Sequence, residues 1–295
     1  MFIIQGDEMM QLIPGGRYTI GTNGMDGIPT DYEGPAVTIE LPSFEIEATT
    51  VTNQEFAIFI DSTGYVTEAE KFGWSFVFHY FLDEATKAAN KIAPNLPWWY
   101  AVDGADWRHP EGPNSTIANR MDHPVVQVSR NDAVAYCHWA NKRLPSEAEW
   151  EVAAKGGTEY DKYPWGKDLL AEGRYHCNIW QGNFPMDNDL YDGYANTAPV
   201  ESYEANGYGC YQMIGNVWEW CSNPARIALH EFLETTADEF WAKHQSINDY
   251  AYAIRGGSFL CHQSYCKRYR IAARNGNTGM SAANNLGFRC AKSLR

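Results

Sequence analysis

The sequence predicts an α+β fold with a large irregular fraction, and three observations support this. The 295 residues include 25 glycines and 14 prolines, which interrupt regular structure throughout the chain. The 11 tryptophans and 18 tyrosines supply large side chains that can pack irregular segments together. Apolar alternation occurs only in short stretches. Because no linker, repeat or low-complexity run divides the chain, residues 1–295 are predicted to form one domain.

Three helix starts are predicted from capping-box patterns, in which a Ser or Thr is followed three residues later by an acidic residue. The pairs are Thr52 with Glu55, Ser129 with Asp132, and Ser146 with Glu149. The first helix is expected to end at Gly64 and the third at Gly156, since glycine is favoured just past a helix C-terminus. The alternating run AVTIEL at residues 36–41 predicts a strand.

Composition disfavours two classes of partner. With 23 basic and 37 acidic residues the net charge is −14, whereas nucleic acids are bound by basic surfaces. The chain has neither a long apolar run nor the basic and apolar regions of a secretion signal at its start. An acidic surface favours a basic peptide substrate. The alternative is that the negative charge only keeps the protein soluble. Seven cysteines, an odd number, suit a reducing compartment. We therefore expect a cytoplasmic protein with no nucleic-acid or membrane partner.

Two cysteines five residues apart, Cys261 and Cys266, follow the glycine pair Gly256 and Gly257. This spacing separates the two side chains on a strand or a helix, so the backbone must bend if both sulfurs serve one site. Glycine permits such a bend. The alternative is two unrelated core residues, because free cysteine is commonly buried and inert. Two thiolates without a second pair favour a soft ion such as Cu(I) over zinc, which prefers four ligands.

The chain closely resembles the formylglycine-generating enzymes, the sulfatase-modifying oxidases. The resemblance is carried by RGGSFLCHQSYCKRYRIAARNGNTGMSAANNLGFRCA and by four earlier segments in the family's order, at residues 51–78, 97–113, 135–151 and 208–220. RLPSEAEWE and GNVWEW mark only the broad superfamily, which includes non-catalytic members; TGYVTEAEKFGWSFVF with the cysteine pair is more specific. The resemblance implies a formylglycine-generating-enzyme fold, a C-type-lectin-like variant with little regular secondary structure.

Residues 222–254 depart most from the family pattern. Phe232, Phe240 and Trp241, interspersed with acidic residues, predict a helical insert. A surface decoration is the simpler interpretation, and a role in the substrate rim or in oligomerisation is the alternative.

The resemblance implies an oxidase that converts a cysteine in a Cys-x-Pro-x-Arg peptide of an unfolded or nascent sulfatase to Cα-formylglycine. Cys261 and Cys266 match the family's Cu(I) ligands, and the substrate cysteine becomes the third ligand. Dioxygen reacts at the copper, a hydrogen leaves the substrate β-carbon and the thioaldehyde is hydrolysed, with a thiol as reductant. Ser258 matches a serine on the oxygen-reactive side, with a turn role as its alternative. We expect a monomer.

Further residues are expected by matched position to contact the peptide: Trp218, Tyr265, Arg274, Asn277 and Asn285. Simple packing is the alternative for Trp218 and Tyr265. His262 lies next to Cys261 but is expected to be packed or hydrogen-bonded rather than a ligand, because adjacent side chains in extended backbone point in different directions.

Two oxygen-rich segments predict calcium sites, because Ca²⁺ prefers carboxylate and carbonyl oxygens. By matched position the first comprises Asn178, Ile179, Asp192 and Tyr194, and the second Gln212, Gly215, Val217 and Glu219. The alternative for each segment is a polar loop that needs no ion.

Two other functions are compatible with parts of this pattern. A non-catalytic binding module on the same fold is disfavoured by the cysteine pair, which such paralogues lack. Oxidative carbon–sulfur bond formation at non-haem iron needs an HxxxHxE-type ligand set, and the eight histidines show no such spacing.

The chain departs from the family pattern at two positions that can alter which peptide fits. Arg130 stands in place of a tryptophan, and Gln263 stands in place of an arginine. Cys137 and Cys290 match positions that are disulfide-bonded in secreted relatives.

Overall fold

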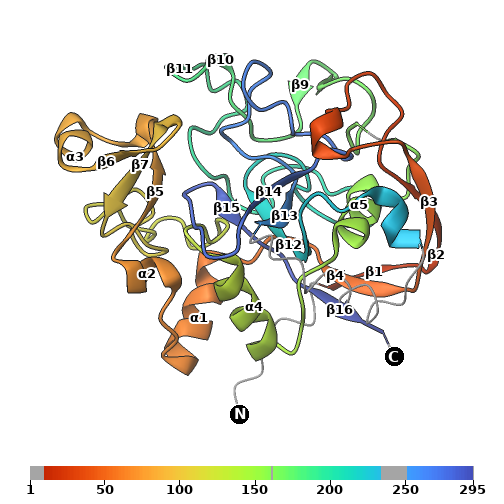
Figure 1. Ribbon diagram of the computed structural model, residues 1–295, viewed down its shortest axis with the longest axis horizontal. Coiled ribbons are helices and arrows are strands. Elements are labelled where there is room, and N and C mark those ends of the chain that lie inside the picture. The colour runs from red at the N-terminus through yellow and green to blue at the C-terminus, as the bar shows by residue number, and fades with distance from the viewer. Residues whose placement is uncertain (1–9, 161, 234–250, 295) are drawn as a thin grey trace.

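The structure, a computed structural model, describes residues 10–160, 162–233 and 251–294. At its centre is a four-stranded sheet (Figure 1), in the order β14 (Asn275–Thr278), β13 (Ala251–Arg255), β12 (Trp218–Pro224) and β15 (Leu286–Gly287). Strand β12 pairs antiparallel with β13 and parallel with β15. Nearly all residues of β12 are buried, so this strand forms the middle of the molecule.

Two further sheets lie outside this centre and include both ends of the described chain. One has the order β1 (Met10–Ile13), β4 (Phe44–Glu47) and β16 (Ala291–Ser293). The other is the hairpin of β2 (Gly16–Ile20) and β3 (Val37–Leu41). The strand predicted at residues 36–41 is therefore confirmed, with its start at Val37. Because β16 pairs with β4, the last described residues are fixed against the first part of the chain.

All three predicted helices are confirmed, each with both hydrogen bonds of its capping box. They are α1 (Asn53–Thr63), α4 (Arg130–Trp139) and α5 (Glu147–Lys155). Gly64 and Gly156 take left-handed backbone angles at the ends of α1 and α5, as predicted. Two shorter helices were not predicted, α2 (Glu68–Phe72) and α3 (Glu84–Ala89), although Thr67 and Glu70 also form a capping box. Helices this short lack the apolar repeat that indicates a helix.

A smaller sheet projects to one side of the molecule, at the left of Figure 1. Its order is β5 (Trp74–Phe78), β7 (Leu96–Asp103) and β6 (Lys91–Ala93). The remaining elements are short: η2 (Pro29–Asp31), η3 (His79–Phe81), η4 (Leu229–Leu233), and the strand pairs β8 (Leu170–Ala171) with β9 (Arg174–Tyr175) and β10 (Gly182–Asn183) with β11 (Asp187–Asn188). Long stretches between these elements are irregular, as the glycine content predicts.

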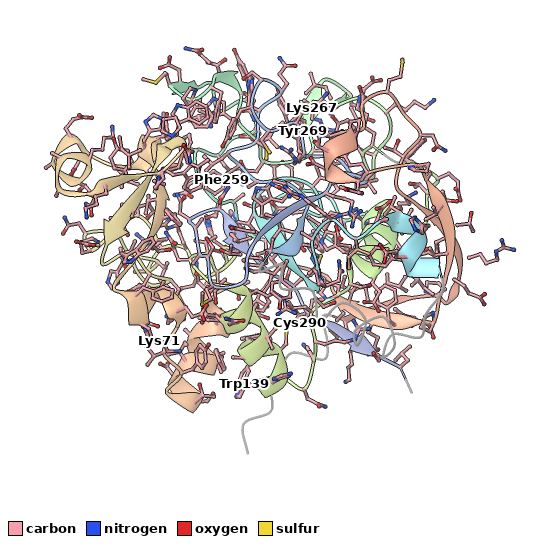
Figure 2. All side chains as sticks on the ribbon, viewed as in Figure 1. Lys71, Trp139, Phe259, Lys267, Tyr269 and Cys290 are labelled. Carbon is pink, nitrogen blue, oxygen red and sulfur yellow. The ribbon has the colours of Figure 1, made fainter. Side chains whose placement is uncertain are left out.

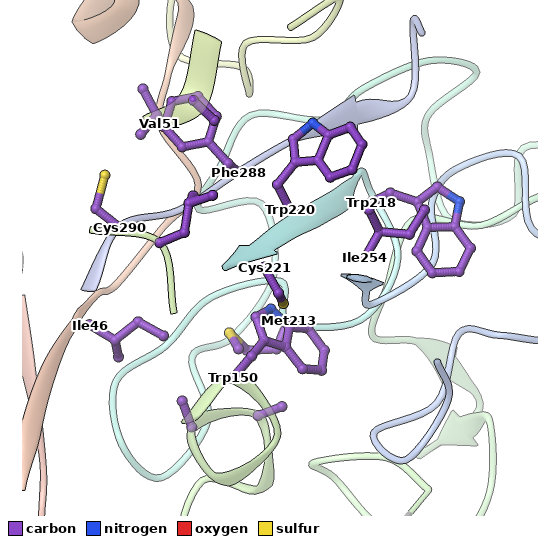
Figure 3. Close-up of a cluster of buried hydrophobic side chains, with 14 of the residues drawn as sticks. Ile46, Val51, Trp150, Met213, Trp218, Trp220, Cys221, Ile254, Phe288 and Cys290 are labelled. Carbon is purple, nitrogen blue, oxygen red and sulfur yellow. The ribbon is translucent and has the colours of Figure 1, made fainter. Parts of the chain in front are cut away.

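Aromatic side chains fill the interior, and buried ion pairs cross it. Figure 3 shows Trp218 and Trp220 of β12 with Trp150 of α5 in the largest core. Three almost fully buried arginines, Arg255, Arg274 and Arg289, pair with Glu147, Glu151 and Glu219, and we call these six residues the arginine core. Buried charges are tolerated only when they are paired and hydrogen-bonded. The arginine core therefore ties helix α5 and β12 to the irregular C-terminal third.

The divergent segment 222–254 is only partly described. It begins within β12, contains η4 and ends within β13. The predicted helical insert over Phe240 and Trp241 lies outside the described residues. Across the three described ranges, no helix combines the length and apolar character needed to cross a bilayer.

Candidate functional site

The two cysteines meet in a tight turn that follows β13, and we call residues 256–266 the cysteine turn. Gly256 and Gly257 both have positive φ, 93° and 77°. A Cβ on Gly257 would lie 3.0 Å from the Tyr269 Cα, so glycine is needed for this close approach. The Cys266 N–H then donates to the His262 carbonyl at 2.8 Å. The Cys261 and Cys266 sulfurs are 2.8 Å apart, which confirms that the backbone bends to bring them together.

Both thiols are free and buried, and their environments differ. Burial, followed by the neighbouring thiol, raises the pKa of Cys261 well above its ordinary value. A hydrogen bond from Cys261, aided by the Arg268 guanidinium, lowers the pKa of Cys266 against the opposing effect of burial. The pair therefore favours a thiolate at Cys266 with Cys261 as its hydrogen-bond donor. Soft thiolate sulfur in a water-poor setting suits a soft metal ion.

The donor set fits Cu(I). Cys261 and Cys266 would hold the ion through their two sulfurs, which are soft ligands of the kind that Cu(I) prefers. Within the described ranges, no group of three or more His, Cys, Asp or Glu side chains is assembled for a metal. The four-ligand zinc alternative thus gains no support from those residues.

Ser258 lies beside Cys261, and Asn285 in turn contacts Ser258. The Ser258 main-chain N–H donates to the Cys261 sulfur at 3.4 Å. Its side-chain oxygen accepts hydrogen bonds from the Asn285 amide at 2.9 Å and from the Leu260 N–H at 3.3 Å. All these groups are buried, so Ser258 is both a turn residue and a neighbour of the sulfur pair.

An aromatic cluster borders the cysteine turn on its exposed side. The Tyr265 side chain, 40% exposed, stacks on Phe184 with ring centroids 4.8 Å apart and meets the edge of Trp98 at 4.7 Å. Phe184 also stacks on His262, whose Nδ1 shares a hydrogen bond with the Ser264 hydroxyl. The prediction that His262 is packed and hydrogen-bonded is confirmed. Phe184 and Trp98 were not singled out, although Trp98 belongs to a matched segment.

Three other predicted peptide contacts lie elsewhere. Trp218 is only 6% exposed and belongs to the largest core cluster. The Arg274 guanidinium is buried and donates to Glu147 and to the Ile227 carbonyl, among others, so its hydrogen-bonding capacity serves the fold. Asn277 lies in the edge strand β14, where its side chain accepts a hydrogen bond from the next N–H. In this structure none of the three is hydrogen-bonded to the cysteine turn.

The first predicted calcium segment surrounds the half-buried carboxylate of Asp192 with N–H donors. Asp192 accepts hydrogen bonds from the N–H groups of Ile179 and Tyr194 at 2.8 and 3.1 Å. The Gln181 amide donates to Asp192 at 2.6 Å and also to the Ile179 carbonyl. The Asn178 side-chain oxygen is buried and has no hydrogen-bond partner. Burial raises the pKa of Asp192. The unpartnered Asn178 oxygen and the Asp192 carboxylate are both ligands of the type that a hard cation such as Ca²⁺ prefers.

The second predicted calcium segment differs because its carboxylate is already paired. Both Glu219 oxygens accept from Arg289, at 2.8 and 2.7 Å, and one also accepts from the Trp150 indole. The Gln212 side-chain oxygen is buried without a partner, so one acceptor remains. Gly215 and Val217 can offer only main-chain oxygens. The prediction that the Glu219 carboxylate serves a cation does not fit this arrangement, since Glu219 is the counter-ion of Arg289.

The two departures from the family pattern have different surroundings. Arg130 is half-buried, stacks on Tyr252 at 3.7 Å and donates to the Ser222 carbonyl at 2.6 Å, so it supports β12. Gln263 is exposed within the cysteine turn. Of the two, only Gln263 is placed to influence a peptide near the sulfurs. The Cys137 and Cys290 sulfurs are buried and 3.5 Å apart, and both are free.

The residues that sequence reasoning missed surround the second cysteine. Arg268 pairs with Asp31 at a nitrogen–oxygen distance of 2.6 Å, and its guanidinium helps to lower the pKa of Cys266. The basic run KRYR directly after Cys266 was a usable signal in an acidic chain. Figure 2 locates this part of the molecule through the labelled side chains of Phe259, Lys267 and Tyr269.

Comparison with known proteins identifies the family. Residues 5–294 match the sulfatase-modifying factor enzyme 1-like domain. The formylglycine-generating enzyme of Thermomonospora curvata is 50% identical, over 96% of this chain and 92% of its own length. That of Bos taurus is 49% identical, over 95% of this chain and 73% of its own. A Bos taurus protein named inactive C-alpha-formylglycine-generating enzyme 2 is also similar, at 42% identity over 96% of this chain and 87% of its own.

Two solved structures share the fold at low sequence identity. PvdO from Pseudomonas aeruginosa has a TM-score of 0.65 at 23% identity, and covers 97% of this chain and 94% of its own. CarF has a TM-score of 0.56 at 19% identity, and covers 97% of this chain and 98% of its own. The predicted fold class, α+β with little regular secondary structure, is confirmed. The extent and identity of these matches show that the chain belongs to the formylglycine-generating enzyme family.

Proposed function

We propose that this protein is a copper-dependent oxidase that converts a cysteine in a Cys-x-Pro-x-Arg peptide of a sulfatase-type client to Cα-formylglycine. The observation that carries the proposal is the meeting of Cys261 and Cys266 in one buried turn, 2.8 Å apart at their sulfurs. Family membership alone does not decide activity, because one relative in the family is named as inactive. The assembled cysteine pair favours the enzyme over the alternative of a non-catalytic or altered-specificity binding module.

The proposed reaction balances with dioxygen and a thiol reductant. The substrate CH₂–SH group loses two protons and two electrons to give a thioaldehyde. Two further electrons come from the reductant, and with two more protons O₂ becomes two molecules of water. Water then replaces sulfur at the thioaldehyde carbon, which releases hydrogen sulfide and leaves the aldehyde. Cu(I), when bound, supplies the centre at which dioxygen is reduced.

The residues of the turn bind and shield the reacting group. Cys261 and Cys266 supply two soft ligands and leave room for a third, the substrate thiolate. Ser258 lies next to Cys261, and the Asn285 amide holds the Ser258 hydroxyl by a hydrogen bond. The aromatic cluster at Tyr265 limits access of water from the exposed side. An acidic protein also suits a peptide with an arginine, which a carboxylate binds through two parallel hydrogen bonds.

We also propose that calcium stabilises the loop around Asp192. The support is the buried, unpartnered side-chain oxygen of Asn178, together with the Asp192 carboxylate that accepts the N–H of the next residue, Ile179. At the second segment, only the Gln212 oxygen is an unpartnered side-chain acceptor, so this segment is the weaker candidate.

The function is tested with the purified full-length chain, a synthetic Cys-x-Pro-x-Arg peptide, Cu(I), oxygenated buffer and a thiol reductant. We expect an aldehyde product that an aminooxy probe traps and mass spectrometry detects. Peptides with serine for cysteine, and with alanine for arginine, serve as matched controls for the reacting atom and for the anchor. Omission of copper or of dioxygen should each stop the reaction.

Two results would contradict the proposed copper-dependent oxidase. Copper-loaded protein that binds the peptide and yields no trapped aldehyde would support the binding-module alternative. Conversion that continues at the same rate under strict exclusion of copper would remove the metal from the proposal.

A further inference from the structure

The β10–β11 hairpin packs against the cysteine turn through its main chain and through one aromatic ring. The N–H of Trp180, which lies just before β10, donates to the Cys261 carbonyl at 3.1 Å. In the turn of the hairpin, the Phe184 ring lies nearly parallel to the rings of Tyr265 and His262, with centroids 4.8 and 6.1 Å away. The hairpin therefore contacts the chain beside both cysteines.

Phe184 packs on the two residues that shape the bend at Cys266. The His262 carbonyl accepts hydrogen bonds from the N–H of Tyr265 at 3.0 Å and from the N–H of Cys266 at 2.8 Å. These two bonds close the main chain into the bend that carries Cys266. Because Phe184 stacks on the side chains at both ends of this bend, a ring that fixes His262 and Tyr265 also fixes the position of Cys266.

The Phe184 ring is held from several directions. It meets Trp98 of β7 at 5.4 Å, Phe78 of β5 at 5.7 Å and Trp180 at 5.4 Å between ring centroids. Aromatic pairs at such distances add stability beyond the apolar area that they bury. Trp98 also meets Tyr265, at 4.7 Å. Phe184 thus joins the small sheet at the side of the molecule to the cysteine turn.

The hairpin that carries Phe184 has little other support at its turn. Two residue pairs join β10 to β11, and a two-stranded hairpin of this size is at best marginally stable alone. The His79 Nε2 donates to the Pro185 carbonyl at 3.0 Å, whereas the next side chain, Met186, is 60% exposed. The Phe184 ring therefore supplies the packing that keeps this turn against the cysteine turn.

The sulfur pair is shielded in this arrangement. Cys261 is 1% exposed and Cys266 8%, so little of the pair is open to a substrate thiolate. A neighbouring element has to move aside for a peptide to reach both sulfurs. Small elements with few buried contacts open at the lowest cost in free energy, and the β10–β11 hairpin is such an element.

We propose that Phe184 is a positioning residue of the cysteine site. Its ring holds the hairpin closed over the cysteine turn, keeps His262 and Tyr265 in place and so restricts access to Cys266. The importance of this closure for catalysis rests on the proposed function, whereas the closure itself is a property of the folded chain and can be measured without copper or peptide.

The experiment measures how fast iodoacetamide alkylates Cys266 in the reduced full chain without added copper, with each cysteine followed separately by mass spectrometry of the digested protein. Phe184→Ala should raise this rate by about tenfold or more, because the loss of several aromatic contacts favours local opening. Phe184→Tyr keeps the ring and should restore a rate close to that of the wild type. Phe184→Leu, which is apolar but not aromatic, should lie between them.

Met186→Ala is the matched control, since it changes an exposed side chain in the same hairpin. It should leave the alkylation rate at Cys266 at the wild-type value. Cys221, buried outside the cysteine turn, is the reference in every sample, and its rate should stay constant. With the Cys-x-Pro-x-Arg peptide, Phe184→Ala should raise KM more than it lowers kcat, because a displaced Tyr265 weakens peptide binding while both metal ligands remain.

The alkylation rates decide the inference independently of the proposed function. A wild-type rate at Cys266 in a folded Phe184→Ala variant would exclude the positioning role, even in a protein that converts the peptide. An equal increase at Cys266 and Cys221 would show that the ring contributes only to general stability. If Phe184→Ala does not fold, Phe184→Leu serves for the same comparison. Faster alkylation at Cys266 alone, in a protein that never converts the peptide, would support the closure and contradict the proposed function.

Discussion

Two regions of the molecule contain carboxylates shielded from solvent, fully in the first and partly in the second, and they use them in opposite ways. In the arginine core each glutamate faces a guanidinium, as Glu219 does with Arg289 at 2.7 Å. In the loop around Asp192 the carboxylate accepts only N–H groups from main chain and amide, and no ion pair found among the described residues includes it. In the first region, arginines of the chain itself neutralise the carboxylates. The second contains a half-buried carboxylate that an external cation could balance.

The difference shows why oxygen-rich sequence alone is a poor guide to a calcium site. Both segments contain an acidic residue near main-chain oxygens, and both match family positions. Whether a carboxylate is available to calcium depends on whether a basic side chain of the protein already pairs with it. Arg289 lies far from Glu219 in sequence and contacts it because β12 and β15 pair in parallel. A pattern within one segment carries no information about such a partner.

The largest expected effect is the loss of a carboxylate from the arginine core. Glu219→Gln should lower the free energy of unfolding by about 3–5 kcal/mol, because Arg289 would remain buried without its counter-ion. Urea denaturation followed by circular dichroism measures this. Glu201→Gln, at an exposed residue, should change the free energy by no more than about 0.5 kcal/mol. A similar small effect for Glu219→Gln would contradict the assignment of Glu219 to structural pairing.

Acid should act on the arginine core through Glu147. Burial alone would raise its pKa, but the Arg274 and Arg255 guanidiniums, helped by Asn223, lower it to about 2. The ordinary value in an unfolded chain is about 4.3. Because the folded-state pKa is depressed, the stabilisation is complete above the unfolded value and is lost as pH falls toward the folded one.

The expected size of this acid effect is about 3 kcal/mol between about pH 5 and about pH 2. It is measured as the difference in pH dependence between the wild type and Glu147→Gln, each unfolded with urea across that range. The variant should be less stable at pH 7 and should show a flatter profile in acid. Parallel profiles would mean that Glu147 does not titrate with the fold.

Features that depend on local contacts could be predicted from the sequence, whereas features that depend on distant contacts could not. The helices at Thr52, Ser129 and Ser146 were predictable because cap and first turn lie within four residues of one another. The cysteine turn was predictable because glycines and cysteines are neighbours in the chain. The partners of Glu219 and Arg274 were not, since they come from segments tens of residues away.

The same reasoning explains the missed residues of the site. Asp31 and Arg268 are separated by more than two hundred residues, and only the folded loop brings them together. Phe184 reaches Tyr265 from a loop near β10. Trp218 and Arg274 were assigned to the peptide through matched position, which does not distinguish a side chain that lines a cleft from one that supports it. Burial makes that distinction.

A smaller effect on stability is expected from calcium at the Asp192 loop. Calcium at about a hundred times its dissociation constant should raise the free energy of unfolding by about 2.7 kcal/mol, because the ion binds only the folded chain. Asp192→Asn should abolish this gain, while Asp189→Asn, at a nearby exposed carboxylate, should keep it. Melting temperatures with calcium and after dialysis against a chelator provide the measurement. An unchanged gain in Asp192→Asn would place the ion elsewhere.

The smallest effect on stability, and the largest on activity, is expected at the cysteine pair. Neither sulfur contributes to an ion pair of the arginine core, and serine is nearly isosteric with cysteine, so Cys261→Ser or Cys266→Ser should cost only about 1 kcal/mol. A hydroxyl is a hard donor and a poor ligand for Cu(I), so copper binding and aldehyde formation should both disappear. Cys177→Ser removes a buried thiol outside the turn and serves as the control.

The two serine variants test whether the cysteine turn is part of the structural framework or a site that the framework holds in place. If the cysteine turn were part of the framework, as the arginine core is, either serine variant would unfold at markedly lower urea concentration. If it is a site held by the framework, the unfolding midpoint stays close to that of the wild type while copper content falls from one equivalent to none. A folded variant that keeps stoichiometric copper and converts peptide would remove Cys261 and Cys266 as ligands. The second outcome is expected, because the left-handed backbone of Gly256 and Gly257, rather than the thiols, gives the turn its bend.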